Sequence, residues 1–232
     1  MIKLSKLTTV IASLGLAIGS TTAMAYEKGD GIVRLGAAYV NQQSGSDPVT
    51  QTGLPLPATL TGTNVTVDDD AEIGLTIAYM LTDHIALELL ASTPFSHQAE
   101  VSGIVPGSLN LAEAKQLPPT LNVQYYPLST TSKFQPYIGL GVNYTLFFGE
   151  KLHKDAANAL GSDGDVSLDD SVGLAYQIGA DFALTDTFGL NIAIWQIDLD
   201  TTATIDLDVG AKIKADIEID PTVFMIGGAF KF

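Results

Sequence analysis

The sequence predicts an all-β protein, an eight-stranded antiparallel transmembrane β-barrel with three short periplasmic turns and four longer extracellular loops. Three observations support this fold class. Apolar residues recur at every second position in eight segments. The positions between them carry small or uncharged polar residues. The connections between segments are short and long in alternation, which is typical of outer-membrane barrels.

The composition disfavours several other classes of protein. Of the 232 residues 46% are hydrophobic and 16% are charged, against about 25% charged in a typical soluble domain. Mean hydropathy is +0.26, yet after residue 20 no apolar run approaches the roughly 18 residues of a membrane helix. A helical membrane protein, a disordered chain and an ordinary cytosolic enzyme are therefore disfavoured. The net charge of −15 argues against a nucleic-acid partner, and the lack of cysteine excludes disulfides and zinc–thiolate sites.

Residues 1–25 are predicted to be a cleaved signal peptide. Lys3 and Lys6 precede a short apolar run over residues 10–18, and Ala23-Met24-Ala25 has the small-x-small pattern of a cleavage site. The alternative, an N-terminal membrane anchor, needs a longer apolar run. We therefore expect an exported chain whose barrel domain is residues 26–232.

The first four predicted strands share a period of two. Their apolar faces are, in order, Val33, Leu35, Ala37 and Tyr39; Ile73, Leu75, Ile77 and Tyr79; Ile85, Leu87, Leu89 and Ala91; and Leu121, Val123 and Tyr125. The intervening positions are mostly small or polar, such as Gly36, Thr76 and Gln124. Each segment therefore has the two distinct faces of a strand.

The last four predicted strands continue the pattern. Their apolar faces are Ile138, Leu140, Val142, Tyr144 and Leu146; Val172, Leu174, Tyr176, Ile178, Ala180 and Phe182; Phe188, Leu190, Ile192 and Ile194; and Phe224, Ile226, Gly228, Phe230 and Phe232. Several of these runs have about ten residues, enough for a tilted membrane strand.

A soluble β-sandwich also alternates, and the second face decides between the two folds. In a sandwich that face meets water and carries Lys, Glu, Thr and Arg, whereas here it carries mainly Gly, Ala, Asn and Gln. Small polar residues fit the crowded interior of a narrow barrel, and the apolar face then meets lipid. Backbone groups in lipid need partners, so the sheet must close on itself.

The connections assign the two ends of the barrel. Residues 81–84, 127–133 and 184–187 are predicted periplasmic turns. The longer polar stretches 41–71, 96–117, 149–171 and 200–220 are predicted extracellular loops. Both chain ends then lie on the periplasmic side, and aromatic residues near the strand ends suit the two membrane interfaces.

Specific motifs resemble a known family. The terminal Phe230 and Phe232 resemble the signal that the bacterial barrel-assembly machinery recognises. Further motifs lie across the mature chain: Gly74-Leu75-Thr76, Tyr79-Met80, Glu88-Leu89-Leu90, Thr93-Pro94-Phe95, Leu117-Pro118-Pro119-Thr120-Leu121, Lys133-Phe134-Gln135-Pro136-Tyr137, Asn143-Tyr144-Thr145, Phe147-Phe148, Asp200-Thr201-Thr202-Ala203 and Asp220-Pro221. In combination these motifs resemble those of the outer-membrane protein W (OmpW) family. Departures from the family concentrate in the loops.

Leu90 and Trp195 are large apolar residues at inward positions, where small or polar residues prevail. One interpretation is a hydrophobic gate that excludes water and ions by dewetting. The other is a plug, because an eight-stranded barrel is only wide enough for side chains or one small ligand. The family resemblance implies that both positions close a channel.

Arg34, Glu88, Asp181 and Lys231 are charged residues at inward positions. Buried charges are usually paired, so structural ion pairs are expected. Closure of the barrel makes the first and last strands neighbours, which should place Arg34 near Lys231, with Asp181 as a counter-ion near the periplasmic end.

The acid-rich stretches are expected to be solvated loops that repel one another. Asp163-Gly164-Asp165 resembles part of a calcium loop but lacks its spacing and closing Glu, so no metal or cofactor is expected. Ser96-His97 is the nearest approach to a catalytic pair, but adjacent strand residues point to opposite faces, so no enzymatic activity is expected.

These observations predict a protein of the Gram-negative outer membrane that gives passive passage to small hydrophobic molecules. The alternative is a structural or receptor barrel with a plugged lumen. Expected partners are membrane lipid, lipopolysaccharide, the assembly machinery and hydrophobic solutes, with the protein itself a monomer.

Overall fold

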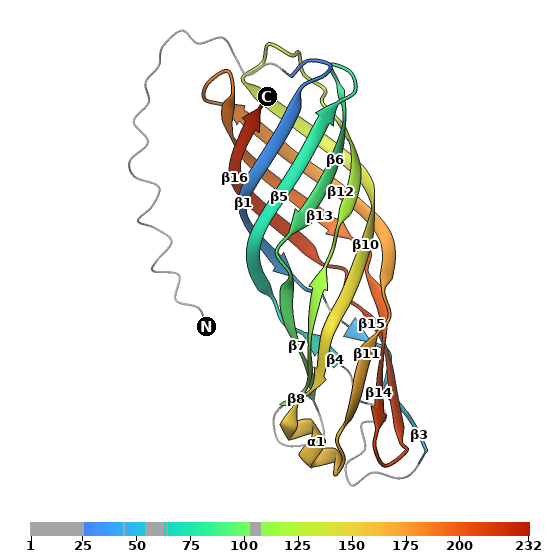
Figure 1. Ribbon diagram of the computed structural model, residues 1–232. Coiled ribbons are helices and arrows are strands. Elements are labelled where there is room, and N and C mark those ends of the chain that lie inside the picture. Colours follow the sequence, from blue (N-terminus) through green and yellow to red (C-terminus); the bar gives the residue numbers. More distant parts are fainter. Residues whose placement is uncertain (1–25, 44, 54–62, 64, 103–107) are drawn as a thin grey trace, which may run out of the picture.

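A computed structural model describes residues 26–43, 45–53, 63, 65–102 and 108–232, so the predicted signal peptide lies outside the described residues. Eight strands form a closed antiparallel barrel (Figure 1). Each pairs with the next in chain order, and the first pairs with the last. The barrel strands are β1 (Gly31–Asn41), β5 (Asp70–Met80), β6 (Ile85–Ser92), β9 (Thr120–Tyr125), β10 (Phe134–Leu152), β12 (Ser171–Ala183), β13 (Phe188–Ile197) and β16 (Thr222–Lys231). The predicted eight-stranded barrel is confirmed.

The barrel wall has an apolar outer face and a mainly polar inner face, as the alternation predicts. Outward side chains such as Ile73, Ile138 and Ile226 are about 60% exposed, whereas inward Asn122 and Asn143 are fully buried. Lipid covers the outer face of such a wall, and the inner face packs on itself.

One pair of opposed residues on β1 and β16 requires glycine. Gly36 lies opposite Gly227, and a Cβ on either would clash with a backbone oxygen of the other strand. The two strands that close the barrel can therefore approach closely at this point.

The barrel strands are joined by short turns at one end, over residues 81–84, 126–133 and 184–187. The C-terminus lies at the same end in Figure 1. This is the predicted periplasmic end.

The four long connections lie at the other end of the barrel, as predicted, but they contain strands in addition to polar loops. Past the barrel, the 19-residue β10 continues and pairs with β8. One extracellular sheet joins β4 (Val65–Val67), β7 (Phe95–Ser102) and β8 (Ser108–Leu117) to β10; the other contains β2 (Gly45–Ser46), β3 (Thr50–Thr52), β11 (Gly164–Leu168), β14 (Asp200–Leu207) and β15 (Lys212–Glu218). Helix α1 (Lys154–Leu160) ends at Gly161, whose left-handed conformation (φ 70°) closes the helix.

This extracellular extension has an apolar core of its own, separate from the barrel core. Along β14 and β15 the acidic side chains alternate with buried ones such as Ile205, Ile213 and Ile217. The acids therefore occupy the outer face of a sheet whose inner face is apolar, which explains why an acid-rich stretch forms strands. Within the described part of the chain, no helix is both long and apolar enough to span a membrane.

Candidate functional site

A buried ionic network spans the lumen in its periplasmic half. Arg34 Nη1 lies 3.0 Å from Glu88 Oε2, and Nη2 lies 2.6 Å from Asp181 Oδ2. Arg34 Nε also donates to Asp181 Oδ1 over 3.0 Å. The three residues come from β1, β6 and β12, which are not neighbours in the barrel, so the guanidinium bridges the interior from wall to wall.

Aromatic and amide side chains complete the network. Tyr126 Oη accepts from Arg34 Nη2 over 2.8 Å, and the Tyr137 ring centroid lies 4.9 Å from Arg34 Cζ. Gln177 Nε2 donates to Glu88 Oε1 over 2.9 Å, and Asn191 Nδ2 donates to Asp181 Oδ1 over 2.7 Å. Both carboxylates thus have several donors, which offsets the cost of burying charge. The periplasmic half of the lumen is therefore filled by polar side chains.

Lys231 lies apart from this network. In the register of β1 and β16 the partner of Arg34 is Ala229, and the partner of Lys231 is Ile32. Lys231 Nζ lies 3.4 Å from Asp30 Oδ2, with both side chains about one-fifth exposed at the periplasmic mouth. Arg34 and Lys231 therefore lie on paired strands two positions apart, but their ionic contacts differ, because Arg34 reaches across the lumen to Glu88 and Asp181. The expected counter-ion Asp181 is in place.

Leu90 and Trp195 lie on the extracellular side of the network. Leu90 is two residues beyond Glu88 on β6, and Trp195 is four residues beyond Asn191 on β13. These strands are four apart in a ring of eight, so the two residues lie on opposite walls. Trp195 is fully buried and Leu90 is 5% exposed. The indole N–H of Trp195 has no hydrogen-bond partner among the described residues.

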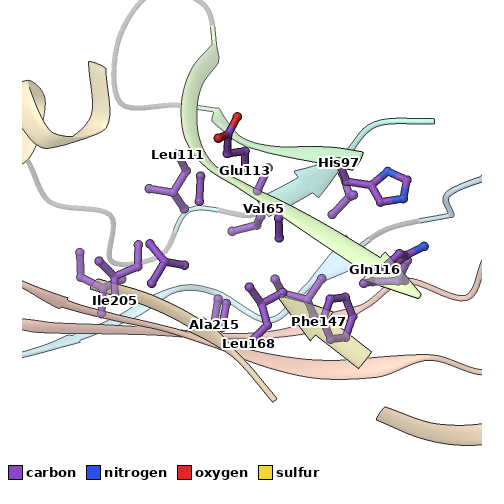
Figure 2. Close-up of a pocket in the computed structure, with 18 of the residues that line it drawn as sticks. Val65, His97, Leu111, Glu113, Gln116, Phe147, Leu168, Ile205 and Ala215 are labelled. Atoms are coloured by element: carbon purple, nitrogen blue, oxygen red, sulfur yellow. The ribbon is translucent and has the colours of Figure 1, made fainter. Parts of the chain in front are cut away.

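Beyond the extracellular end of the barrel, a small apolar cavity of about 60 Å³ lies between the two extracellular sheets (Figure 2). Val65 and Leu111 from one sheet point toward Leu168, Ile205 and Ala215 from the other. The volume is that of about two molecules of liquid water. The two sheets share no strand pairing in the described chain, so the cavity can widen without breaking the ladders of either sheet.

His97 borders the cavity at its barrel end. Its Nδ1 lies 2.9 Å from the Asp68 carbonyl oxygen, and Gln42 Nε2 lies 3.2 Å from its Nε2. A neutral ring with the proton on Nδ1 satisfies both contacts, donating to the carbonyl and accepting from the amide. Burial lowers the pKa of His97, against the opposing effect of Asp68 and Asp70. Ser96 is exposed while His97 is buried, as expected for adjacent strand residues.

The acidic stretches are partly structured, which differs from the predicted repulsive loops. Asp69 accepts hydrogen bonds from Tyr39 Oη, over 2.7 Å, and from the Gln42 backbone N–H, over 2.9 Å. Burial raises the pKa of Asp69, but these hydrogen bonds outweigh it and lower the pKa overall. Asp206 lies 2.9 Å from Lys212 Nζ. Among the described residues no three acidic or histidine side chains converge as a metal site.

Phe230 and Phe232 lie on the outer, lipid-facing side, 47% and 77% exposed. The Phe232 backbone exchanges two hydrogen bonds of 2.9 Å with Gly31. Their role as an assembly signal stays a prediction.

A closed eight-stranded barrel with an apolar exterior and a polar, packed interior defines the class of bacterial outer-membrane β-barrel proteins. Within that class the chain belongs to the OmpW family, whose family model matches residues 27–232.

Named relatives and solved structures agree with this assignment. Outer membrane protein W of Vibrio cholerae serotype O1 is 44% identical over 217 residues, covering 93% of this chain and 94% of the relative. Outer membrane protein W of Escherichia coli K12 is 37% identical, covering 97% and 98%. The crystal structure of OprG from Pseudomonas aeruginosa has a TM-score of 0.81 at 43% identity, covering 90% and 99%. The structure of outer membrane protein AlkL, at 22% identity and a TM-score of 0.62, shares the fold. The protein therefore resides in the outer membrane of a Gram-negative bacterium.

Proposed function

We propose that the protein gives small hydrophobic molecules passive passage across the outer membrane, with Leu90 and Trp195 as the gate of the lumen. The observation that carries the proposal is the apolar cavity in the extracellular extension, which lies between two sheets whose strand ladders are separate. An apolar solute gains about 25 cal/mol for each Å² that it removes from water. The cavity therefore offers such a solute a favourable first site outside the lipid.

The gate sorts solutes by polarity. Leu90 and Trp195 face each other across a narrow tube and offer water few hydrogen-bond partners, so water and ions are excluded by dewetting. A hydrophobic solute loses no hydrogen bonds at this point. The proposed gate therefore favours the solutes that the cavity also favours.

The exit from the lumen follows from the ionic network below the gate. An apolar molecule moving straight to the periplasm would have to separate Arg34 from Glu88 and Asp181, and exposing buried charges to an apolar group is costly. We therefore propose that the solute leaves on the extracellular side of Arg34, sideways into the lipid. In this proposal the protein acts as a monomer among lipid and lipopolysaccharide, and the assembly machinery inserts it by Phe230 and Phe232.

A second candidate function is a structural or receptor barrel whose lumen is permanently plugged. The observation that favours it is the complete burial of Trp195. The two functions differ in whether a solute can pass from the cavity into the lumen.

Uptake of the hydrophobic fluorophore N-phenyl-1-naphthylamine by intact cells tests the proposal. Cells with the protein should take up the dye faster than cells without it. Ala215→Phe, which fills the cavity, should abolish the difference, whereas Ala37→Phe on the lipid-facing side of β1 should preserve it. Equal uptake with and without the protein would favour the plugged barrel.

A further inference from the structure

Tyr26 fills the periplasmic mouth of the lumen although it belongs to no barrel strand. Its side chain is 1% exposed, and its hydroxyl donates to Asp181 Oδ2 over 2.9 Å. Its ring meets that of Tyr126 edge to face, with 5.6 Å between centroids and 76° between planes. Among the described partners of Asp181, Arg34 and Asn191 belong to strands, and Tyr26 alone does not.

A short turn holds Tyr26 in this place. Gly29 adopts a φ of 100°, which glycine tolerates, and its N–H donates to the Met80 carbonyl over 2.9 Å. The Lys28 N–H donates to Asp83 Oδ1 in the first periplasmic turn over 2.9 Å. Tyr26 precedes the ladder of β1, so its ring can leave the mouth without breaking a strand pairing of the barrel.

The chemistry at Asp181 gives the ring and the hydroxyl distinct roles. Asp181 is fully buried, and Arg34, Asn191 and Tyr26 donate to it. If the phenol leaves, the carboxylate loses a donor on the periplasmic side, and water is the natural replacement because an incompletely bonded buried charge is costly. Tyr26 therefore determines whether water from the periplasm reaches the ionic network.

We propose that Tyr26 is the periplasmic seal of the lumen: its ring closes the mouth, and its hydroxyl takes the place of water at Asp181. This adds a second closure, of opposite chemistry, to the one in the proposed function. The gate of Leu90 and Trp195 excludes ions and water because it is apolar. The seal keeps water from reaching a buried ion pair. Tyr26 also directly follows the predicted cleavage point, so the seal is the first residue of the predicted mature chain.

Accessibility of an introduced thiol tests the seal, because the natural sequence has no cysteine. Ala183→Cys places the thiol on β12, two residues past Asp181 toward the periplasmic end, at a position 6% exposed. The reagent is a charged, membrane-impermeant methanethiosulfonate, applied to the folded full-length protein in detergent. Tyr26→Ala should speed labelling by about tenfold or more, because the thiol no longer depends on rare local opening of the mouth. Tyr26→Phe keeps the ring and should label almost as slowly as the parent.

Two further variants keep the test decisive. Asp83→Ala removes the anchor of Lys28 without altering the lumen, and should speed labelling by a smaller factor. Tyr79→Ala removes a lipid-facing tyrosine from the same end of the barrel and should leave labelling unchanged. The seal is wrong if Tyr26→Ala and Asp83→Ala both label at the parent rate, or if Tyr79→Ala accelerates labelling as much as Tyr26→Ala. Dye uptake through the extracellular cavity should be unaffected by Tyr26→Ala, so failure of the seal and failure of the transport proposal remain distinguishable.

Discussion

At the scale of single residues, Arg34 organises the lower lumen through the geometry of its guanidinium. Arg34 Nε and Nη2 both donate hydrogen bonds to Asp181, Nη1 donates to Glu88, and Nη2 also donates to Tyr126. A planar fork with five N–H donors can serve partners on different walls at once, which a lysine ammonium cannot do with the same directionality. One inward-pointing residue thereby fixes the arrangement of side chains from several strands.

Removing one carboxylate from this network should destabilise the barrel strongly. We expect Asp181→Asn to lower the free energy of unfolding by about 3–5 kcal/mol, the usual cost of breaking a buried ion pair. Asp206→Asn breaks the exposed pair with Lys212 and should cost about 1 kcal/mol or less. Urea unfolding of the protein in lipid vesicles measures both. Equal losses in the two variants would mean that the buried pair contributes no more than a surface pair.

The two proposed closures in series predict a specific pattern of ion conduction. Leu90→Ala with Trp195→Ala removes the proposed apolar gate but leaves the periplasmic half of the lumen filled by the ionic network and Tyr26. We expect a small rise in conductance across planar bilayers from these two substitutions, and a much larger rise when Tyr26→Ala is added. If the large side chains act as a plug, Trp195→Ala should chiefly destabilise the barrel, by about 3–5 kcal/mol. A lowered melting temperature with conductance at baseline in the triple variant would favour the plug over the gate.

His97 should make the extracellular extension sensitive to mild acid. Its pKa is lowered in the folded protein, mainly by burial, relative to about 6.5 for an unperturbed histidine. The unfolded chain therefore binds the proton first as the pH falls. The contribution of His97 to stability is complete above about pH 6.5 and is lost as the pH falls toward the folded-state pKa.

Melting in detergent between pH 7.5 and 5 checks this expectation. The melting temperature of the parent should fall with pH over this range, and His97→Phe should fall less. If the melting temperatures of the parent and of His97→Phe fall equally with pH, groups other than His97 cause the acid sensitivity.

At the scale of elements, β16 joins two roles, because it closes the barrel and carries the C-terminus. It pairs with β1 over ten residues, and Phe232 extends this contact through its two backbone bonds with Gly31. Deletion of Phe232 removes those bonds and the exposed ring that the assembly machinery is expected to recognise. We expect less protein in the outer membrane with little change in total synthesis, measured by fractionation and immunoblotting. Unchanged membrane levels would argue against the signal.

The predicted elements were those on which the membrane imposes two faces. Lipid outside and a packed lumen inside force strict alternation, so residues such as Ile73 and Thr76 identify their strand and its orientation. The extracellular strands are harder to predict, because acidic residues obscure the alternation: Ile213 and Ile217 have the same period of two, but Asp216 and Glu218 make the stretch resemble a polar loop.

The lumen network was foreseen in part, and its limits are physical. The inward phase identified Arg34, Glu88 and Asp181 as candidates, but phase does not determine how far a long side chain reaches across a barrel. Tyr26 was not identified at all. It contacts Asp181 over a separation of 155 residues, and as a turn residue before the first strand it has no period to reveal it.

At the scale of the whole molecule, the length of β10 has a consequence for permeation kinetics. The 19 residues of β10 run roughly 60 Å along the strand, whereas a tilted membrane strand needs only about ten residues to cross the hydrocarbon layer. The extension therefore carries its apolar core into the hydrated sugar layer that covers a Gram-negative cell. In that layer each added methylene group costs a solute about 0.8 kcal/mol, or roughly a fourfold slower crossing. A dry path through the layer should remove much of this penalty. Uptake of n-alkanols of increasing length checks this consequence. The uptake rate should fall less steeply with chain length in cells with the protein than in cells without it. An equally steep fall in both would show that the solutes cross the sugar layer in water.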